Sequence, residues 1–146
     1  MESITVPASM EQLEEVLENI EQYLIREGCK EDDKRVILIS AEELFTNIAS
    51  YAYPDPAKPG VLQVDCYVQK LENGKKRVTL RFLDQGIPYN PLAKKDPDLT
   101  LSIDQRPVGG LGIYMVKQFM DQVEYQYDEG FNILVIQKDI DVSSGG

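Results

Sequence analysis

The sequence predicts an α+β domain, in which a mostly antiparallel, mixed β-sheet carries helices on one face and forms a two-layer α/β sandwich. Strand-like and helix-like segments follow one another in the order β-α-α-β-β-loop-α-β-β. The spacing of apolar residues alternates between the helical period of three to four and the strand period of two. The dipeptide Asn73-Gly74, a strong hairpin signal, separates two alternating runs and so predicts an antiparallel strand pair.

The length and composition suit a single domain. A chain of 146 residues with 42% hydrophobic and 27% charged residues can bury one core, so we expect one domain over residues 1–140 and a disordered tail over residues 141–146. No apolar run approaches the ~20 residues of a membrane-spanning helix, and the N-terminus lacks the pattern of a signal peptide. We therefore expect a cytoplasmic protein.

Charge and residue usage exclude several functions. The net charge is -10, and residues 1–33 hold ten acidic and two basic side chains, so we expect no binding to nucleic acid or to a membrane surface. This acidic segment is either a solvated helix face or a docking surface for a basic partner. The chain has no histidine, which excludes histidine-dependent catalysis and a phosphohistidine within it. Cys29 and Cys66 have no spacing typical of a disulfide framework or a zinc site.

The first half of the chain is predicted to form a short strand over residues 3–6 and then two helices. Ser9 and Gln12 have the spacing of a capping box, and Gly28 is a natural end for the first helix. The second helix extends over about residues 32–53, where two prolines follow it. The apolar stripe of the first helix is Met10, Leu13, Leu17, Ile20 and Leu24, and that of the second is Ile37, Ala41, Leu44, Ile48 and Ala52.

The second half is predicted to contain two strand pairs with a loop and a helix between them. The predicted strands cover residues 61–70, 77–83, 123–127 and 131–138. A loop containing proline and aspartate spans about residues 88–108. The third helix begins at a glycine cluster and carries the apolar residues Ile113, Val116, Phe119 and Met120. This order places one helix between the two strand pairs.

Glu43 and Asn47 are four residues apart in the second predicted helix, so their side chains share a face at the edge of the buried stripe. The amide oxygen of Asn47 suits a hard cation such as Mg²⁺, which also binds phosphate oxygens. The carboxylate of Glu43 can take a proton from an attacking hydroxyl. Two ordinary solvated helix positions have the same spacing, so spacing alone leaves both interpretations open.

Asp84 follows a predicted strand in phase with its buried residues Val78, Leu80 and Phe82. An isolated buried carboxylate is energetically costly, and a ligand that donates hydrogen bonds to it, such as the exocyclic amine of adenine, removes that cost. Gly86 lets such a ligand approach the backbone. A simple turn after the strand, where Asp and Gly are common, is the alternative.

Gly109, Gly110 and Gly112 open the third predicted helix. Glycines there expose backbone N–H groups at the positive end of the helix dipole, which is an anion site. A flexible junction between loop and helix is the alternative. The Walker motif is absent, and the cluster follows a loop rather than the strand that precedes a Rossmann glycine motif.

Together the three motifs resemble the gyrase, chaperone and histidine-kinase ATPase superfamily, which has the Bergerat fold, from about residue 4 to 138. Within the superfamily, the likeness is to the small anti-sigma-factor serine/threonine kinases. The string AEELFTNIASYAYP resembles their N box, DQGIPYNP their first glycine box and GGLGIYMVKQFMD their second. The last two strings are specific to this subgroup.

The resemblance implies roles for the residues of the first two motifs. Glu43 would be the general base and Asn47 the ligand of Mg²⁺. Asp84 would bind adenine, with Gly86 beside it.

The resemblance also implies a phosphate site and a lid. The ATP phosphates would be held at the helix start, formed by Gly109, Gly110, Leu111 and Gly112. Residues between about 92 and 108 would form a short ATP lid, from which Arg106 could reach a phosphate. A solvated loop cation is the alternative for Arg106.

Two positions depart from the family pattern. Many superfamily members have a threonine near adenine in the penultimate or last strand, where Asn132 is the nearest candidate for a hydrogen-bonding group. The family often has a histidine near the end of the N-box helix, where Tyr51 and Tyr53 stand in this chain. Any role of that histidine is therefore not carried over.

The leading interpretation is an ATP- and Mg²⁺-dependent serine/threonine kinase that phosphorylates a STAS-type anti-anti-sigma protein. The resemblance also implies a sigma factor as the sequestered partner and a homodimer. The second interpretation is a non-catalytic, ATP-binding adaptor that sequesters a regulatory protein. A fragment of a histidine kinase is third, and a metabolic enzyme is the weakest, because the polar motifs converge on a nucleotide and indicate no second substrate pocket.

Overall fold

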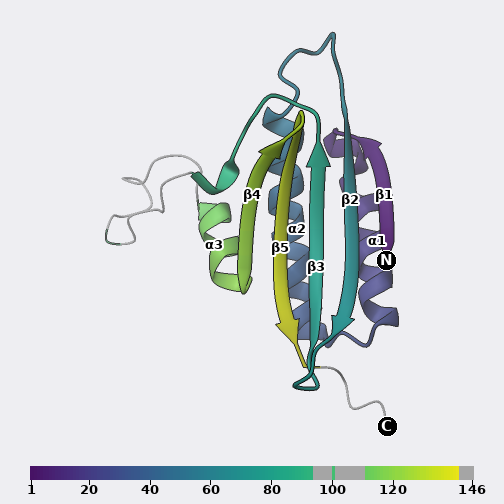
Figure 1. Ribbon diagram of the computed structural model, residues 1–146. Coiled ribbons are helices and arrows are strands. Elements are labelled where there is room, and N and C mark those ends of the chain that lie inside the picture. The colour runs from purple at the N-terminus through teal and green to yellow at the C-terminus, as the bar shows by residue number, and fades with distance from the viewer. Residues whose placement is uncertain (94–99, 101–110, 142–146) are drawn as a thin grey trace.

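The computed structural model describes residues 1–93, 100 and 111–141. In these parts of the chain, five strands form one sheet, and the α-helices pack against one of its faces (Figure 1). The elements in chain order are β1 (Glu2–Pro7), the 3-10 turn η1 (Met10–Gln12), α1 (Leu13–Arg26), α2 (Glu31–Tyr51), β2 (Val61–Lys70), β3 (Lys76–Asp84), the 3-10 turn η2 (Pro91–Ala93), α3 (Leu111–Phe119), β4 (Gln122–Asp128) and β5 (Phe131–Ile140). The predicted two-layer α+β sandwich is confirmed.

The strands are arranged in the spatial order β1-β2-β3-β5-β4, and each neighbouring pair is antiparallel. The sheet is therefore wholly antiparallel, whereas the sequence had predicted a mostly antiparallel, mixed sheet. The crossover through α3 does make β4 parallel to β3, but β5 lies between the two and pairs with both. In the β3–β5 register, Asp84 stands opposite Asn132, which brings two polar residues together at one end of the sheet.

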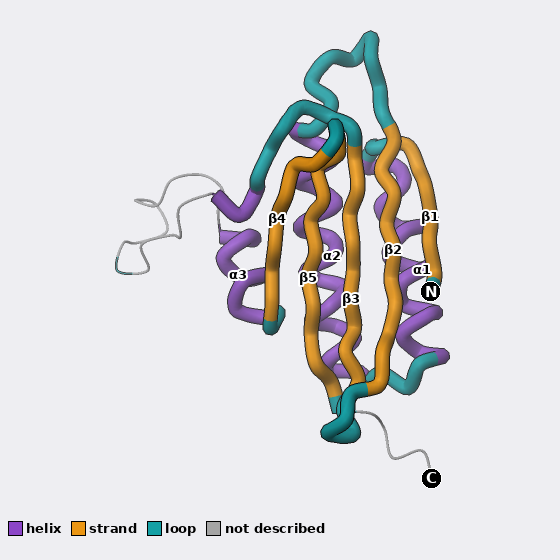
Figure 2. The backbone as a smooth tube through the Cα atoms, in the orientation of Figure 1, coloured by secondary structure: helices purple, strands orange, loops and turns teal. Residues whose placement is uncertain are grey.

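The hydrophobic core fills the space between the sheet and the helices, and the tube in Figure 2 shows α1 and α2 lying along the same side of the strands. The predicted apolar stripe of α2 is confirmed, since Ile37, Ala41, Leu44, Ile48 and Ala52 are all buried. The stripe of α1 was wrong at one position: Met10 is 48% exposed. Residues Met10–Gln12 form η1, so α1 begins only at Leu13 and Met10 falls out of helical phase. Val16 and Tyr23 are buried on α1 in addition to the predicted Ile20 and Leu24.

Local sequence signals were confirmed at the hairpin and at Gly28, which follows the end of α1 with a φ of +81°, but not at the start of α1. Gly74 has the φ of +84° that the turn between β2 and β3 requires, and the Asn73 side chain accepts a hydrogen bond of 2.9 Å from the backbone N–H of Lys75. Ser9 caps η1 by accepting from the backbone N–H of Glu11, so it does not cap α1. Gln12, the N-cap residue of α1, makes no capping hydrogen bond with its side chain.

One end of the sandwich is held together by the loop that follows β3, which crosses the top of Figure 1. The backbone N–H of Ile87 donates to the carbonyl of Ala52, just after α2, at 2.8 Å. A Cβ atom on Gly86 would overlap the same Ala52 carbonyl, so the loop approaches α2 as closely as only glycine allows. The Tyr53 hydroxyl donates to the carbonyl of Val61 at 2.7 Å and accepts from the N–H of Gln85 at 2.8 Å. These contacts attach the loop after β3 to the end of α2.

No helix within the described ranges is long and apolar enough to cross a membrane. The predicted tail lies outside the described residues, except for Asp141.

Candidate nucleotide-binding site

Helix α2 presents Glu43 and Asn47 to one side of the site, and their side chains meet as the four-residue spacing predicted. The Asn47 amide nitrogen donates to the backbone carbonyl of Glu43 at 2.8 Å and to its Oε1 at 2.9 Å. Asn47 is 5% exposed, and the Tyr89 hydroxyl donates to its Oδ1 at 3.4 Å. These bonds orient the amide of Asn47 so that its nitrogen faces Glu43 and its oxygen faces the loop after β3.

The start of α3 lies directly against the carboxylate of Glu43. A Cβ atom on Gly112 would overlap the carboxylate carbon and both carboxylate oxygens of Glu43. The absence of a side chain at this position therefore allows α3 to approach α2 at this point. The N-terminal end of a helix carries a partial positive charge, which favours an acidic neighbour and, equally, a phosphate group.

Asp84 ends β3 on the side of the sheet that faces the helices, and it is 3% exposed. Its Oδ1 accepts hydrogen bonds of 2.9 Å from the backbone N–H of Gly86 and from the side-chain amide of Asn132. Burial raises the pKa of the Asp84 carboxyl above its ordinary value, and these two hydrogen bonds oppose the rise. Within the described part of the chain, no hydrogen bond reaches the second oxygen, Oδ2. Asp84 is thus a buried acceptor with one oxygen left for a ligand.

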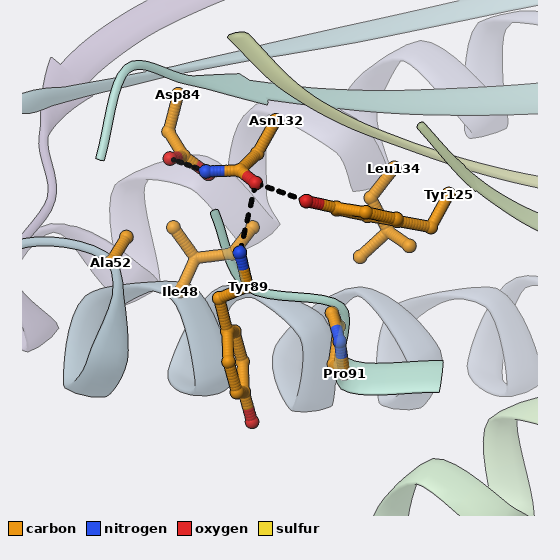
Figure 3. A pocket seen from close by; sticks show the side chains of 8 residues that line it. All are labelled: Ile48, Ala52, Asp84, Tyr89, Pro91, Tyr125, Asn132 and Leu134. Carbon is orange, nitrogen blue, oxygen red and sulfur yellow. Dashed lines mark hydrogen bonds between the residues drawn. The ribbon is translucent and has the colours of Figure 1, made fainter. Parts of the chain in front are cut away.

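Asn132 stands at the centre of a hydrogen-bond network on this side of the sheet (Figure 3). Its amide nitrogen donates to Asp84 and, at 2.8 Å, to the carbonyl of Ile87. Its Oδ1 accepts from the backbone N–H of Tyr89 at 3.1 Å and from the hydroxyl of Tyr125. The sequence indicated Asn132 but neither tyrosine. The only signal for Tyr125 was its phase, which it shares with Val123 on the apolar side of β4.

Asp84 and Asn132 border a small cavity at the end of the sheet. Its lining is mostly apolar, with a few polar groups, which is usual for a ligand pocket. The lining residues, all labelled in Figure 3, are Ile48, Ala52, Asp84, Tyr89, Pro91, Tyr125, Asn132 and Leu134. Its volume of about 10 Å³ is close to the minimum for a single water molecule. A nucleobase therefore needs room that the side chains lining the cavity must make, since the space between them is far smaller than a purine ring.

The aromatic ring of Tyr89 also lies against α2. The ring centroids of Tyr89 and Tyr51 are 5.3 Å apart, with an angle of 41° between the planes. Aromatic pairs of this geometry are favourable by about 0.5–1.5 kcal/mol beyond their burial. Tyr51 is 50% exposed, so this pair forms the outer edge of the site.

Several residues predicted for the site lie outside the described residues. These are Arg106, Gly109 and Gly110, together with most of the predicted lid over residues 92–108. Leu111 is described as the first residue of α3. Gly112 is the one predicted phosphate-site glycine that the structure places, and it lies beside Glu43.

Comparison with known proteins identifies the family to which the chain belongs. A family model for the histidine kinase-like ATPase domain matches residues 6–138. The chain belongs to this family. The matched range includes α2, the end of β3 and the start of α3, which carry the three predicted motifs of this histidine kinase-like ATPase domain.

Two relatives of this ATPase domain have names that state an activity. The serine/threonine-protein kinase BtrW of Bordetella bronchiseptica is 26% identical over 117 residues, which cover 80% of this chain and 78% of that protein. The serine-protein kinase RsbW of Bacillus mycoides is 26% identical over 114 residues, which cover 75% of this chain and 67% of that protein.

Two solved structures share the fold. The match to the RsbU and RsbW domains of a Mycobacterium tuberculosis protein has a TM-score of 0.58 and 12% identity, and covers 94% of this chain but only 32% of that longer chain. The match to the SiaB–SiaC complex of Pseudomonas aeruginosa has a TM-score of 0.53 and 16% identity, and covers 96% and 90% of the two chains.

The residues of this ATPase domain fit a nucleotide accompanied by a magnesium ion. Asp84 offers a buried acceptor for an exocyclic amine, and Asn47 offers a neutral oxygen ligand. The described residues contain no cluster of three or more His, Cys, Asp or Glu side chains that could hold a metal alone. Mg²⁺ in a nucleotide site keeps several waters and relies on phosphate oxygens of its substrate, so a single amide oxygen from the protein suits it.

Proposed function

We propose that this chain is an ATP-dependent serine/threonine protein kinase and anti-sigma regulator that phosphorylates a STAS-type anti-anti-sigma protein. One observation carries the proposal: the carboxylate of Glu43 lies against Gly112 at the start of α3, one helical turn from Asn47. A general base is thereby next to the helix end that suits a phosphate. The kinase names of the two relatives support the same reaction.

Each side chain then has a separate task. Asp84 accepts a hydrogen bond from the adenine amine, and the backbone N–H of Gly86 beside it donates to the other oxygen of the same carboxylate. Glu43 takes the proton from the serine or threonine hydroxyl of the partner. Magnesium, held through Asn47 and the phosphates, would neutralise charge that develops on the transferred phosphoryl group. The backbone at Gly109, Gly110, Leu111 and Gly112, with Arg106, would hold the phosphates.

The partners are proposed from the family resemblance. A STAS-type protein would supply the phosphorylated hydroxyl, and a sigma factor would be the protein that this chain sequesters. We also propose a homodimer, which sedimentation of the purified chain tests directly. A kinase of this kind acts in the cytoplasm, where both ATP and sigma factors are found.

Substitutions in α2 test the chemistry. Glu43→Gln keeps the shape of the side chain but cannot take up a proton, so we expect Mg-ATP binding close to wild type and phosphotransfer reduced about 10²–10⁴-fold. Asn47→Ala removes the amide oxygen and should weaken both binding and transfer. Glu42→Gln is the matched control, because Glu42 is the adjacent acid of α2 and is exposed to solvent.

The assay combines calorimetry of Mg-ATP with transfer of labelled phosphate to a STAS-type substrate. Wild-type rates in Glu43→Gln would show that Glu43 is not the base. ATP binding by the wild type without transfer to any STAS-type partner would favour the second candidate, a non-catalytic ATP-binding adaptor.

A further inference from the structure

The environment of Asn132 raises the question of what this residue does for the nucleotide. It lies opposite Asp84 in the β3–β5 register and is 4% exposed. The family pattern indicated Asn132 as the nearest candidate for a hydrogen-bonding group near adenine, which leaves open whether it contacts the base directly. Asn132 can act on the nucleotide directly, by a hydrogen bond to the base, or indirectly, by positioning Asp84, and its hydrogen bonds distinguish these roles.

The hydrogen-bonding capacity of Asn132 is fully used inside the protein. A carboxamide has two N–H donors and two acceptor lone pairs. Both donors are engaged, by Asp84 Oδ1 at 2.9 Å and the carbonyl of Ile87 at 2.8 Å. Both acceptor positions are engaged as well, by the N–H of Tyr89 and the hydroxyl of Tyr125. Asn132 therefore has no group left for the base, and its partners exclude the flipped amide, which would place N–H groups against the Tyr89 N–H.

The same bonds determine which oxygen of Asp84 can meet a ligand. Asn132 and the backbone of Gly86 both donate to Oδ1, so the plane of the carboxylate is set from two directions. Oδ2 has no bond from the described residues and is left for a donor in the cavity. Without Asn132, the carboxylate would keep only the Gly86 contact and could turn about its side-chain torsions.

We infer that Asn132 is a positioning residue for nucleobase selection: held by Tyr125 and the Tyr89 backbone, it orients Asp84 so that Oδ2 accepts the 6-amino group of adenine. This inference rests on the proposed function, since it requires that the cavity takes an adenine nucleotide. It assigns to Tyr125 a supporting part, because the Tyr125 hydroxyl orients the amide without reaching Asp84.

The test compares two ligands that differ at one group. ATP carries the 6-amino group, and purine riboside triphosphate lacks it but keeps the ring, the sugar and the phosphates. Calorimetry with Mg²⁺ gives the affinity of each variant for both ligands. In the wild type we expect ATP to bind about ten- to a hundredfold more tightly, the usual range for a hydrogen bond to a charged acceptor.

In Asn132→Leu we expect most of this preference to be lost, while the affinity for purine riboside triphosphate stays near the wild-type value. A merely structural role would instead weaken both ligands alike. Tyr125→Phe is the milder second variant, which keeps Asn132 and should reduce the preference about two- to tenfold. Gln137→Ala is the control, since Gln137 is a carboxamide of the same strand that bonds to Thr79 on the opposite face and should leave the preference intact.

The possible outcomes separate the two proposals. If the wild type binds neither triphosphate, the proposed function and the inference are both wrong. If the wild type prefers ATP and the variants at Asn132 and Tyr125 keep that preference, only the inference is wrong. Equal losses for both ligands in the folded variants also contradict the inference, because they show support of the pocket without selection of the base.

Discussion

Gly112→Ala should separate the stability of this protein from its activity. The added methyl group would stand at the position where a Cβ overlaps the Glu43 carboxylate. The rest of α3 is unchanged, and alanine keeps the backbone N–H that would face a phosphate. The overlap involves the far end of a flexible side chain, so we expect Glu43 to rotate away while both helices stay in place.

The size of the effect follows from the contact. Carbon atoms pack at about 3.5–4.0 Å, so Glu43 must move by more than about 1 Å, and its 2.9 Å hydrogen bond from Asn47 is lost. A hydrogen bond to a charged group contributes about 1.5–3 kcal/mol, whereas alanine in place of glycine in a helix recovers up to about 1 kcal/mol. We therefore expect a free energy of unfolding within about 2 kcal/mol of wild type. Misplacement of a catalytic group by about 1 Å costs about 10²-fold in rate.

The assay is phosphate transfer from labelled ATP, with urea denaturation and calorimetry of Mg-ATP on the same samples. The decisive comparison is a cycle with Glu43→Gln. If the methyl group acts through Glu43, then adding Gly112→Ala to Glu43→Gln lowers the rate no further. A wild-type rate in Gly112→Ala, or a full additional loss in the double variant, would refute this reasoning.

Asp84→Asn should weaken ATP binding about ten- to a hundredfold in calorimetry, yet it should not lower the midpoint of thermal unfolding, because a carboxamide oxygen can still accept from Gly86 and Asn132 while the buried charge is removed. Unchanged affinity would exclude adenine from Asp84. Burial raises the pKa of Asp84, so the contribution of this residue to the free energy of unfolding is present below the ordinary pKa of aspartate and is lost as the pH rises through the raised value. The free energy of unfolding of Asp84→Asn minus that of the wild type should therefore grow with pH over this window. A constant difference would contradict the raised pKa. The affinity for ATP should instead fall as the pH is lowered, because acid protonates Asp84. Gly86→Ala should lower the free energy of unfolding by about 1–3 kcal/mol in urea, since its methyl group would overlap the backbone of Ala52, which cannot move without shifting α2; an unchanged midpoint would show that the loop adapts freely.

Much of the fold was predictable because it depends on local periodicity. The strand β2 begins and ends where alternation predicted, at Val61 and Lys70, and the hairpin follows from Asn73-Gly74. The start of α1 was not predictable in the same way. A 3-10 turn and a first helical turn share their capping residues, so Ser9 could not indicate which of the two would follow.

The positions of three side chains of the candidate site were predictable from local patterns, their assembly was not, and their roles stay predictions. The spacing of Glu43 and Asn47 and the phase of Asp84 placed these side chains correctly. The bond between Asp84 and Asn132 joins residues 48 positions apart, and it depends on the register of two strands that no local pattern determines. The contact of Gly112 with Glu43 likewise depends on how two helices cross, which is a property of packing and not of either segment.

The position of β5 has a consequence for the synthesis of this protein. β5 follows the other four described strands in the sequence, yet it pairs on one side with β3 and on the other with β4. On a ribosome, β1, β2 and β3 emerge first and can pair in sequence, whereas the edge of β3 stays open until β5 has left the exit tunnel. During that interval Asp84 lacks Asn132, and the exposed edge offers unpaired backbone groups to other chains. A chain stopped before β5 therefore has neither the complete sheet nor the bond between Asp84 and Asn132.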